Sequence, residues 1–201
     1  MKIKELMITD PITVTGETSI TEALEIMRTN SIRHLPVVSA DNTLEGFLTL
    51  SDLKQGLLPS AVGDLTLTDL MIREPICVEP DDDVELAALL FYRNKIGGMP
   101  VLENQKVVGI ITETDILRIF VDMMGILSSS SRIDVLIDDR PGELKRALEI
   151  IHAAGVEIIS IGQIARKTAE KAYFFRLTPC DPQPIARALE KEGFHVLDTM
   201  E

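Results

Sequence analysis

The chain has 201 residues, and a prior of roughly one domain for every 150 residues predicts one to two domains. Its 20 lysine and arginine residues against 32 aspartate and glutamate residues give a net charge of −12. A surface this acidic disfavours nucleic acids and anionic membrane surfaces as partners. Aromatic residues make up only 4% of the chain and tryptophan is absent, so the core is predicted to be aliphatic.

A repeat organises the first two thirds of the chain. The string LMITDPITV at residues 6–14 returns as LMIREPICV at residues 70–78, and GFLTLSD at 46–52 returns as GIITETD at 109–115. Self-similarity at a fixed spacing indicates two copies of one structural unit. We therefore predict a first repeat over residues 1–62 and a second repeat over residues 63–127.

Each repeat is predicted to contain a strand, a helix, two further strands and a second helix. Apolar residues recur at helical spacing over residues 20–27 and again over residues 84–91. Residue pairs typical of helix starts precede these runs: Ser19 with Glu22, and Asp82 with Glu85.

The second half of each repeat is rich in β-formers. Strand pairs are predicted at 35–38 with 44–50, and at 99–102 with 107–112. Ser51 and Thr114 follow these pairs and are predicted to cap the second helix of each repeat.

The serines at residues 128–131 have the composition of a flexible linker, and we place a domain boundary there. Beyond it, residues 132–201 predict a different domain. It is expected to begin with a strand at 133–137, a helix at 144–151 that Gly155 ends, and a hairpin of 156–165 with 172–178. A second helix follows, capped by Asp181, with Pro182 at its first position and Gly193 at its end. The last expected element is a strand at 194–199. This βαββαβ order is that of a ferredoxin-like unit.

Neither the cysteines nor the N-terminus indicates export. Cys77 and Cys180 lie far apart without a CxxC motif, and they are predicted to be buried apolar side chains rather than a disulfide. No leader peptide and no run of 18 apolar residues is evident, so we expect a cytoplasmic protein.

Two family resemblances follow from these strings. Residues 1 to about 125 resemble a tandem pair of CBS domains, the Bateman module, through LPVV with GFLTLSD and through PVL with GIITETD. Residues 132 to about 200 resemble an ACT domain through DRPGEL at 139–144 and the βαββαβ order. The whole layout resembles that of the accessory proteins of acetoin utilisation. The resemblance implies an α+β fold, with two βαββα CBS units followed by a ferredoxin-like ACT domain.

The CBS resemblance implies an adenosine derivative as a regulatory ligand, with no cofactor required. A helix N-terminus favours phosphate, and an ionised aspartate can accept both ribose hydroxyls. The expected nucleotide-binding residues are Thr13, Val14, Arg33, His34, Leu35, Pro36, Val37, Thr49, Ser51, Asp52, Ile76, Cys77, Val78, Gly98, Met99, Pro100, Val101, Thr112, Thr114 and Asp115. The alternative is that the aspartates only cap helices and the prolines only fix strand entry.

A phosphate also needs a counter-charge in so acidic a chain. Arg33 and His34 are the best candidates, with Lys54, Arg93, Lys95 and Arg118 as outlying ones; the alternative for each is a solvated surface charge. At the repeat spacing, Arg33 and His34 align with Gly97 and Gly98, so the two sites are not equivalent. If the repeats pack face to face, Arg33 or His34 serves the other repeat. We expect one competent site at least, and allow a second of different affinity.

The ACT resemblance implies a candidate amino-acid site in the loop before its first helix, formed by Asp139, Pro141, Gly142, Glu143 and Leu144. Glu157 stands where amino-acid-binding members often have asparagine, which leaves dimerisation as the alternative role of this domain.

No catalytic or metal-binding constellation is evident. The three histidines are far apart and no phosphate-hydrolysing loop is present. We therefore expect a regulatory protein rather than an enzyme, which senses AMP, ADP or ATP as a homodimer with an unidentified protein partner. The alternatives are a structural adaptor without physiological ligand sensing, a sensor of an S-adenosyl ligand, and an unrecognised enzyme.

Overall fold

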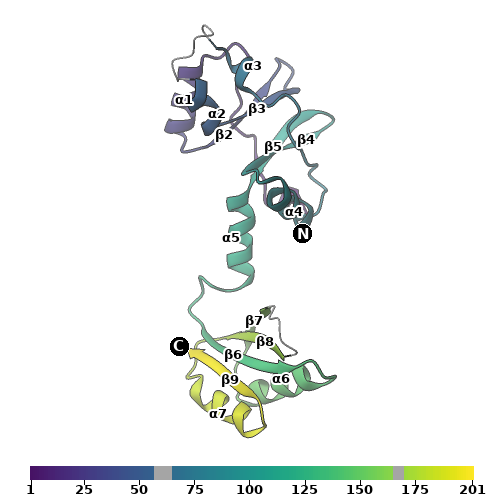
Figure 1. Cartoon of the computed structure of the whole chain (residues 1–201), viewed down its shortest axis with the longest axis vertical. Coiled ribbons are helices and arrows are strands. Elements are labelled where there is room, and N and C mark those ends of the chain that lie inside the picture. Colours follow the sequence, from purple (N-terminus) through teal and green to yellow (C-terminus); the bar gives the residue numbers. More distant parts are fainter. Residues whose placement is uncertain (57–64, 165–169) are drawn as a thin grey trace. The chain divides into compact units, whose positions relative to one another are not determined.

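The computed structural model describes residues 1–56, 65–164 and 170–201, and the chain divides into two compact units, Met1–Leu117 and Arg118–Glu201 (Figure 1). Two sequence predictions lie outside the described residues. They are the boundary between the repeats at residues 62 and 63, and the end of a strand at Ala165.

The first unit contains both repeats. A 3-10 turn (Ile3–Glu5) precedes β1 (Ile8–Thr9), α1 (Ile20–Thr29), β2 (His34–Val38), β3 (Leu44–Thr49) and α2 (Leu50–Gly56). The second repeat supplies α3 (Leu67–Leu70), α4 (Val84–Asn94), β4 (Gly98–Glu103), β5 (Lys106–Thr112) and α5 (Glu113–Met123). The long helix, the strand pair and the second helix predicted for each repeat are confirmed. The opening strand predicted for the second repeat is wrong: α3 stands there instead, and Val78 forms only an isolated bridge to Val101. Helix α5 begins in the first unit and ends in the second.

Each repeat forms an antiparallel hairpin covered by an amphipathic helix. Strand β2 pairs with β3, and β4 pairs with β5 in the corresponding register. In the first repeat, α1 buries Ala23 and Met27 against Leu35 and Leu48 of the hairpin. The core of the first repeat is aliphatic, as the composition predicts, and Leu35 and Val37, which lie two residues apart on β2, both belong to it.

Four predicted helix caps are displaced by one or two positions. Helices α2 and α5 begin one residue ahead of Ser51 and Thr114, because the carboxylates of Asp52 and Asp115 reach back to the preceding threonines. Helix α4 begins after Asp83, since the Asp82 carboxylate accepts the Glu79 N–H instead. At α7, Pro182 takes the cap position, although the Asp181 carboxylate accepts the Gln183 N–H at 2.9 Å.

The second unit has the predicted βαββαβ order. Its elements are β6 (Ser131–Asp138), α6 (Glu143–Ala153), β7 (Ile158–Ile164), β8 (Glu170–Leu177), α7 (Gln183–Lys191) and β9 (His195–Met200). The antiparallel sheet has the order β7-β8-β6-β9, so β7 and β9 are its edges. Ser131, which we placed in the linker, begins β6.

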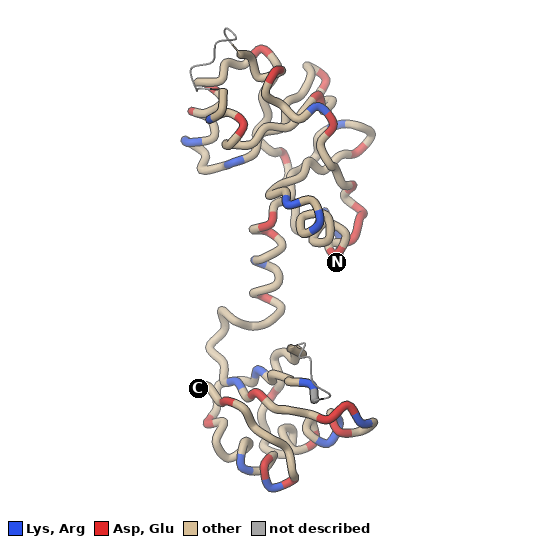
Figure 2. The backbone as a smooth tube through the Cα atoms, viewed as in Figure 1, with Lys and Arg blue, Asp and Glu red and all other residues tan. Residues whose placement is uncertain are grey.

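The core of the second unit lies between this sheet and its two helices. Ile133 and Val135 of β6, Phe175 of β8 and Ile151 of α6 are fully buried there. Acidic residues are spread over both units rather than gathered in one stripe (Figure 2). Cys77 and Cys180 are free thiols and only partly buried, where full burial was predicted.

We expect Phe175→Ala to lower the free energy of unfolding by about 3–5 kcal/mol, because the buried ring leaves a cavity. Phe120→Ala, which truncates a phenylalanine that is 60% exposed, serves as the control and should cost less than about 1 kcal/mol. Urea unfolding of both variants followed by circular dichroism makes the measurement. Equal losses would contradict the core assignment.

Candidate functional site

Two chain segments cross between the repeats and shape the site. Ile8 pairs with β5 of the second repeat, whereas Val14 pairs with β2 of the first, where its N–H donates to the Pro36 carbonyl at 3.0 Å. Ile72 and Val78 repeat this arrangement in the opposite direction. Residues 8–14 therefore pass from one sheet to the other, across the space between the two hairpins.

A threonine and an aspartate are fixed together where each hairpin meets its second helix. The Asp115 Oδ2 accepts the Thr112 N–H at 2.9 Å and the Thr112 hydroxyl at 2.7 Å. Asp52 makes the same two bonds with Thr49, at 2.8 and 2.7 Å. Among the described residues, no hydrogen bond reaches the Oδ1 of either aspartate. Each aspartate is thus a helix cap with one carboxylate oxygen still available.

At the starts of α2 and α5, fewer backbone N–H groups are free than the sequence predicts. The Leu50 N–H donates to the Arg33 carbonyl at 2.9 Å, and the Glu113 N–H donates to the Gly97 carbonyl at 3.2 Å. The Asp52 N–H donates to the Thr49 hydroxyl at 3.3 Å. The first two bonds tie each second helix to the opening residues of a hairpin. Together the three bonds occupy two N–H groups at the start of α2 and one at the start of α5.

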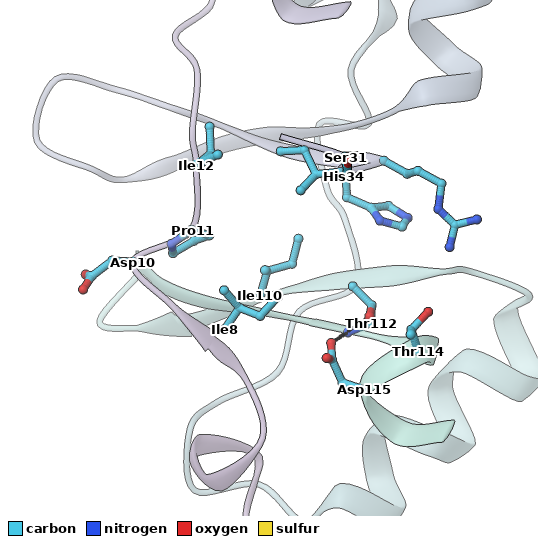
Figure 3. A pocket seen from close by; sticks show the side chains of 12 residues that line it. Ile8, Asp10, Pro11, Ile12, Ser31, His34, Ile110, Thr112, Thr114 and Asp115 are labelled. Carbon is cyan, nitrogen blue, oxygen red and sulfur yellow. Dashed lines mark hydrogen bonds between the residues drawn. The ribbon is translucent and has the colours of Figure 1, made fainter. Parts of the chain in front are cut away.

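A cavity of about 350 Å³ lies between the crossing segment and the Asp115 end of the second repeat (Figure 3). This volume is within the range of small-molecule sites. Its lining comes from three places: the crossing segment with Ile8, Asp10, Pro11 and Ile12; the turn before β2 with Ser31, Ile32, Arg33 and His34; and the start of α5 with Ile110, Thr112, Thr114 and Asp115. In Figure 3, Thr112 and Asp115 are joined by their hydrogen bond beneath His34.

The cavity combines aliphatic walls with a small set of charges. Arg33 supplies the permanent positive charge, and Asp10 and Asp115 supply negative ones. Asp115 is 8% exposed. Burial lowers the pKa of the His34 imidazole below its ordinary value, Arg33 lowers it further and Asp52 raises it. His34 is therefore neutral at pH 7.

The structure brings together only part of the expected site. Five of the expected residues line the cavity: Arg33, His34, Thr112, Thr114 and Asp115. As expected for face-to-face repeats, the first two come from the first repeat and the other three from the second. The remaining expected residues do not line it: Thr13, Val14, Leu35, Pro36, Val37, Thr49, Ser51, Asp52, Ile76, Cys77, Val78, Gly98, Met99, Pro100 and Val101. Leu35, Val37, Met99 and Val101 have no exposed surface and belong to the hairpin cores.

Several lining residues were not expected from the sequence. They are Ile8, Asp10, Pro11, Ser31, Ile32 and Ile110. The first three belong to the repeated string at residues 6–14, so the sequence repeat was a signal that could have found them. Their place in the cavity follows only from the structure, in which that segment crosses to the second repeat.

The candidate amino-acid loop of the second unit is braced by ion pairs. Asp139 accepts a hydrogen bond from Lys171 at 2.7 Å, and Arg146 lies 3.0 Å from the Glu143 carboxylate. Gly142 has a positive φ of 95°, which explains the glycine at this turn. Leu144 packs against the core of the unit.

The family model of the CBS domain matches residues 3–58 and 63–122, which together form more than half of the chain. The chain therefore belongs to the CBS domain family. An inosine-5′-monophosphate dehydrogenase of Methanocaldococcus jannaschii is 32% identical over 163 residues, covering 80% of this chain and 32% of that enzyme. The chain spans about a third or less of the length of the first curated relatives it matches.

Solved structures of CBS proteins share the fold of the first unit. A CBS domain pair in complex with 5′-methylthioadenosine and S-adenosyl-L-methionine is 32% identical, has a TM-score of 0.56, and is matched over 61% of this chain and 97% of its own length. CBSX2 in complex with AMP is 26% identical, with a TM-score of 0.54 over 60% of this chain and 96% of its own. The putative acetoin utilization protein of Vibrio cholerae is 26% identical, with a TM-score of 0.56 over 63% and 95%.

Within residues 1–56, 65–164 and 170–201, no group of three histidine, cysteine, aspartate or glutamate side chains is arranged to hold a metal ion. None of the described helices is both long and apolar enough to cross a membrane.

We expect the His34 imidazole to titrate below 6.5 in the folded protein, because burial disfavours its charged form. Asp52→Asn should lower this pKa further, and Arg33→Gln should raise it. Histidine NMR titration of the three proteins makes the measurement, with His34→Gln to assign the resonance. A midpoint at or above 6.5 would contradict the prediction.

The lowered pKa of His34 also makes the free energy of unfolding depend on pH. As the pH falls through the unfolded-state pKa near 6.5, the unfolded chain binds a proton at His34 before the folded chain does. The free energy of unfolding therefore decreases as the pH is lowered through this value, and His34→Gln should lack that part of the decrease.

Proposed function

We propose that this protein is a regulatory protein that senses an adenosine derivative in the Asp115 cavity. The observation that carries the proposal is the carboxylate of Asp115, which is held by Thr112 through Oδ2 and keeps Oδ1 available at the wall of the cavity. A fixed carboxylate at this place suits two neighbouring ribose hydroxyls.

The aliphatic walls suit the base of the same ligand. Ile8, Ile12, Ile32 and Ile110 come from both repeats and line the cavity. Burying a flat apolar ring between such side chains is favourable by about 25 cal/mol for each Å² removed from water. A ligand that contacts both repeats stabilises one arrangement of them, which is the basis of a regulatory response.

The charges of the lining favour a ligand with at most one phosphate. Arg33, Asp10 and Asp115 all belong to the lining, so a single phosphate gains one cation, whereas a triphosphate adds repulsion from the two carboxylates. AMP is therefore favoured over ATP. The same two carboxylates suit the positive charge of an S-adenosyl ligand, which is the second candidate. The complexes of similar CBS pairs with AMP and with S-adenosyl-L-methionine support both ligands.

We infer a regulatory rather than an enzymatic role for the chain itself. Burial raises the pKa of the Cys77 thiol to about 11, so it is protonated at neutral pH and is a weak nucleophile.

The adaptor alternative is favoured by one exposed surface. Leu86, Leu89 and Tyr92 of α4 are 41%, 41% and 84% exposed. At the repeat spacing, the corresponding residues of α1 are the charged Glu22, Glu25 and Arg28. The outer face of α4 is apolar, whereas that of α1, the equivalent helix of the first repeat, is charged. An exposed apolar face of this kind is suited to a protein contact.

We expect Asp115→Ala to weaken adenosine-ligand binding at least tenfold, because hydrogen bonds to a charged group contribute about 1.5–3 kcal/mol. Isothermal titration calorimetry and thermal shift with AMP, ADP, ATP, 5′-methylthioadenosine and S-adenosylmethionine make the measurement. Asp69→Ala is the matched control, since Asp69 caps α3 with the same bonds to Thr66, at 2.9 and 2.7 Å, outside the cavity.

If none of the five ligands bound to the protein, the sensing role would be contradicted. Equal weakening by Asp69→Ala would show that Asp115 acts only through helix stability. The adaptor role predicts instead that partner binding is unchanged by ligand in the wild type and in Asp115→Ala.

For the second unit we propose an ACT domain that serves dimerisation or binds a second ligand. Its sheet order of β7-β8-β6-β9 and its two covering helices support this assignment. The edge strand β9 offers unpaired backbone groups, which a second copy would satisfy. The loop with Asp139 and Glu143 remains the candidate amino-acid site.

We expect the full chain to be a dimer by light scattering, and Leu197→Lys on β9 to shift it toward the monomer. Ile159→Lys on the other edge strand is the matched control, because the two side chains are 38% and 40% exposed. A monomeric wild type, or the same shift in both variants, would contradict dimerisation through β9. A panel of amino acids in the same assay tests the second-ligand role.

A further inference from the structure

The two repeats differ at the residue that opens each hairpin. His34 begins β2, and its counterpart at the repeat spacing, Gly98, begins β4. The preceding residue also differs, with Arg33 in the first repeat and Gly97 in the second, whereas the threonine and aspartate that follow each hairpin are the same in both. One side of the module therefore carries an imidazole where the other carries no side chain.

The His34 imidazole is packed in place on the first-repeat side. Its ring stacks on the Phe47 ring, with 5.7 Å between centroids and 12° between planes. A methyl group on Gly98 would lie 2.9 Å from the His34 Cγ, and one on Gly97 would lie 3.3 Å from its Nε2. Asp52 is close enough for its charge to act on the ring. The imidazole thus lies among Phe47, Asp52 and the two glycines.

The counterparts of these four neighbours all line the Asp115 cavity. At the repeat spacing, Phe47 corresponds to Ile110, Asp52 to Asp115, Gly97 to Arg33 and Gly98 to His34, and each of these counterparts borders the cavity. The hollow beside Asp115 therefore occupies, by the symmetry of the repeat, the place that the His34 ring fills beside Asp52.

We propose that His34 closes the ligand site of the first repeat, so that each chain binds one adenosine ligand, at Asp115. This inference rests on the proposed function, and it assigns to His34 the choice of which of two similar sites is open. Gly98 keeps the Asp115 site open because it adds no side chain there. Asp52 then serves only as the cap of α2.

The two glycines of the second repeat are part of the same arrangement. A side chain at Gly98 would meet the His34 ring at less than van der Waals distance, so the module accommodates one imidazole at this contact and not two. Removal of the ring from residue 34 frees the space that a side chain at residue 98 needs. The open site can therefore be exchanged between the repeats by exchanging these two residues.

The test is the stoichiometry of binding, measured by titration calorimetry on the full chain with AMP and with S-adenosylmethionine. We expect one site per chain in the wild type and two in His34→Gly. In the wild type, Asp115→Ala should weaken binding at least tenfold and Asp52→Ala should leave it unchanged. In the His34→Gly background, Asp52→Ala should return the stoichiometry from two to one.

The exchange variant, His34→Gly with Gly98→His, guards against a simple loss of folding. It should bind one S-adenosylmethionine, a ligand without a phosphate, because the Asp52 site has Gly97 where the Asp115 site has Arg33. That binding should be weakened at least tenfold by Asp52→Ala and not by Asp115→Ala. His152→Ala, which removes a histidine of α6, is the control and should bind as the wild type does.

Each result bears on one of the two proposals. Two sites in the wild type, one site in a folded His34→Gly variant, or an equal loss from Asp52→Ala and Asp115→Ala would overturn the role of His34 while leaving ligand sensing intact. Absence of binding by any adenosine ligand to any of these proteins would overturn both.

Discussion

The first unit depends on the exchange of short segments between its two hairpins. Ile8 bonds to the second repeat and Val14 to the first, while Ile72 and Val78 do the reverse. Backbone hydrogen bonds hold both ends of each crossing, as where Val14 accepts from the Val38 N–H at 2.8 Å. Neither repeat completes its sheet from its own sequence, so the cavity is necessarily built from both.

Duplication followed by local change accounts for the differences between the repeats. Backbone pairing, core positions and the Thr–Asp caps are kept at both copies, because they hold each hairpin to its helix. The outer face of α4 and the residue that opens each hairpin differ between the two copies. Comparison of two copies within one chain thus separates residues that maintain the fold from those that distinguish the sites.

The sequence predicted the helices and strands well because apolar periodicity and the repeat act over short distances. It missed the exact helix starts at Leu50 and Glu113. There the side chains of Asp52 and Asp115, rather than the predicted hydroxyls of Ser51 and Thr114, bond to the residue before the helix. It placed Leu35 and Val37 in the site, but strand alternation turns them into the core. Asp10 was missed because its position follows from the crossing of a segment between sheets, which local patterns do not encode.

The Asp115 carboxylate accepts the Thr112 N–H at the end of the hairpin and lies in the first turn of α5. A ligand that bonds to it stabilises the first turn of that helix, and helix formation is cooperative along its length. The last turn of α5 lies in the second unit. Under the proposed function, occupancy of the cavity and the helical order of α5 are thermodynamically linked, and by reciprocity fraying of the far end of α5 lowers the affinity for the proposed ligand.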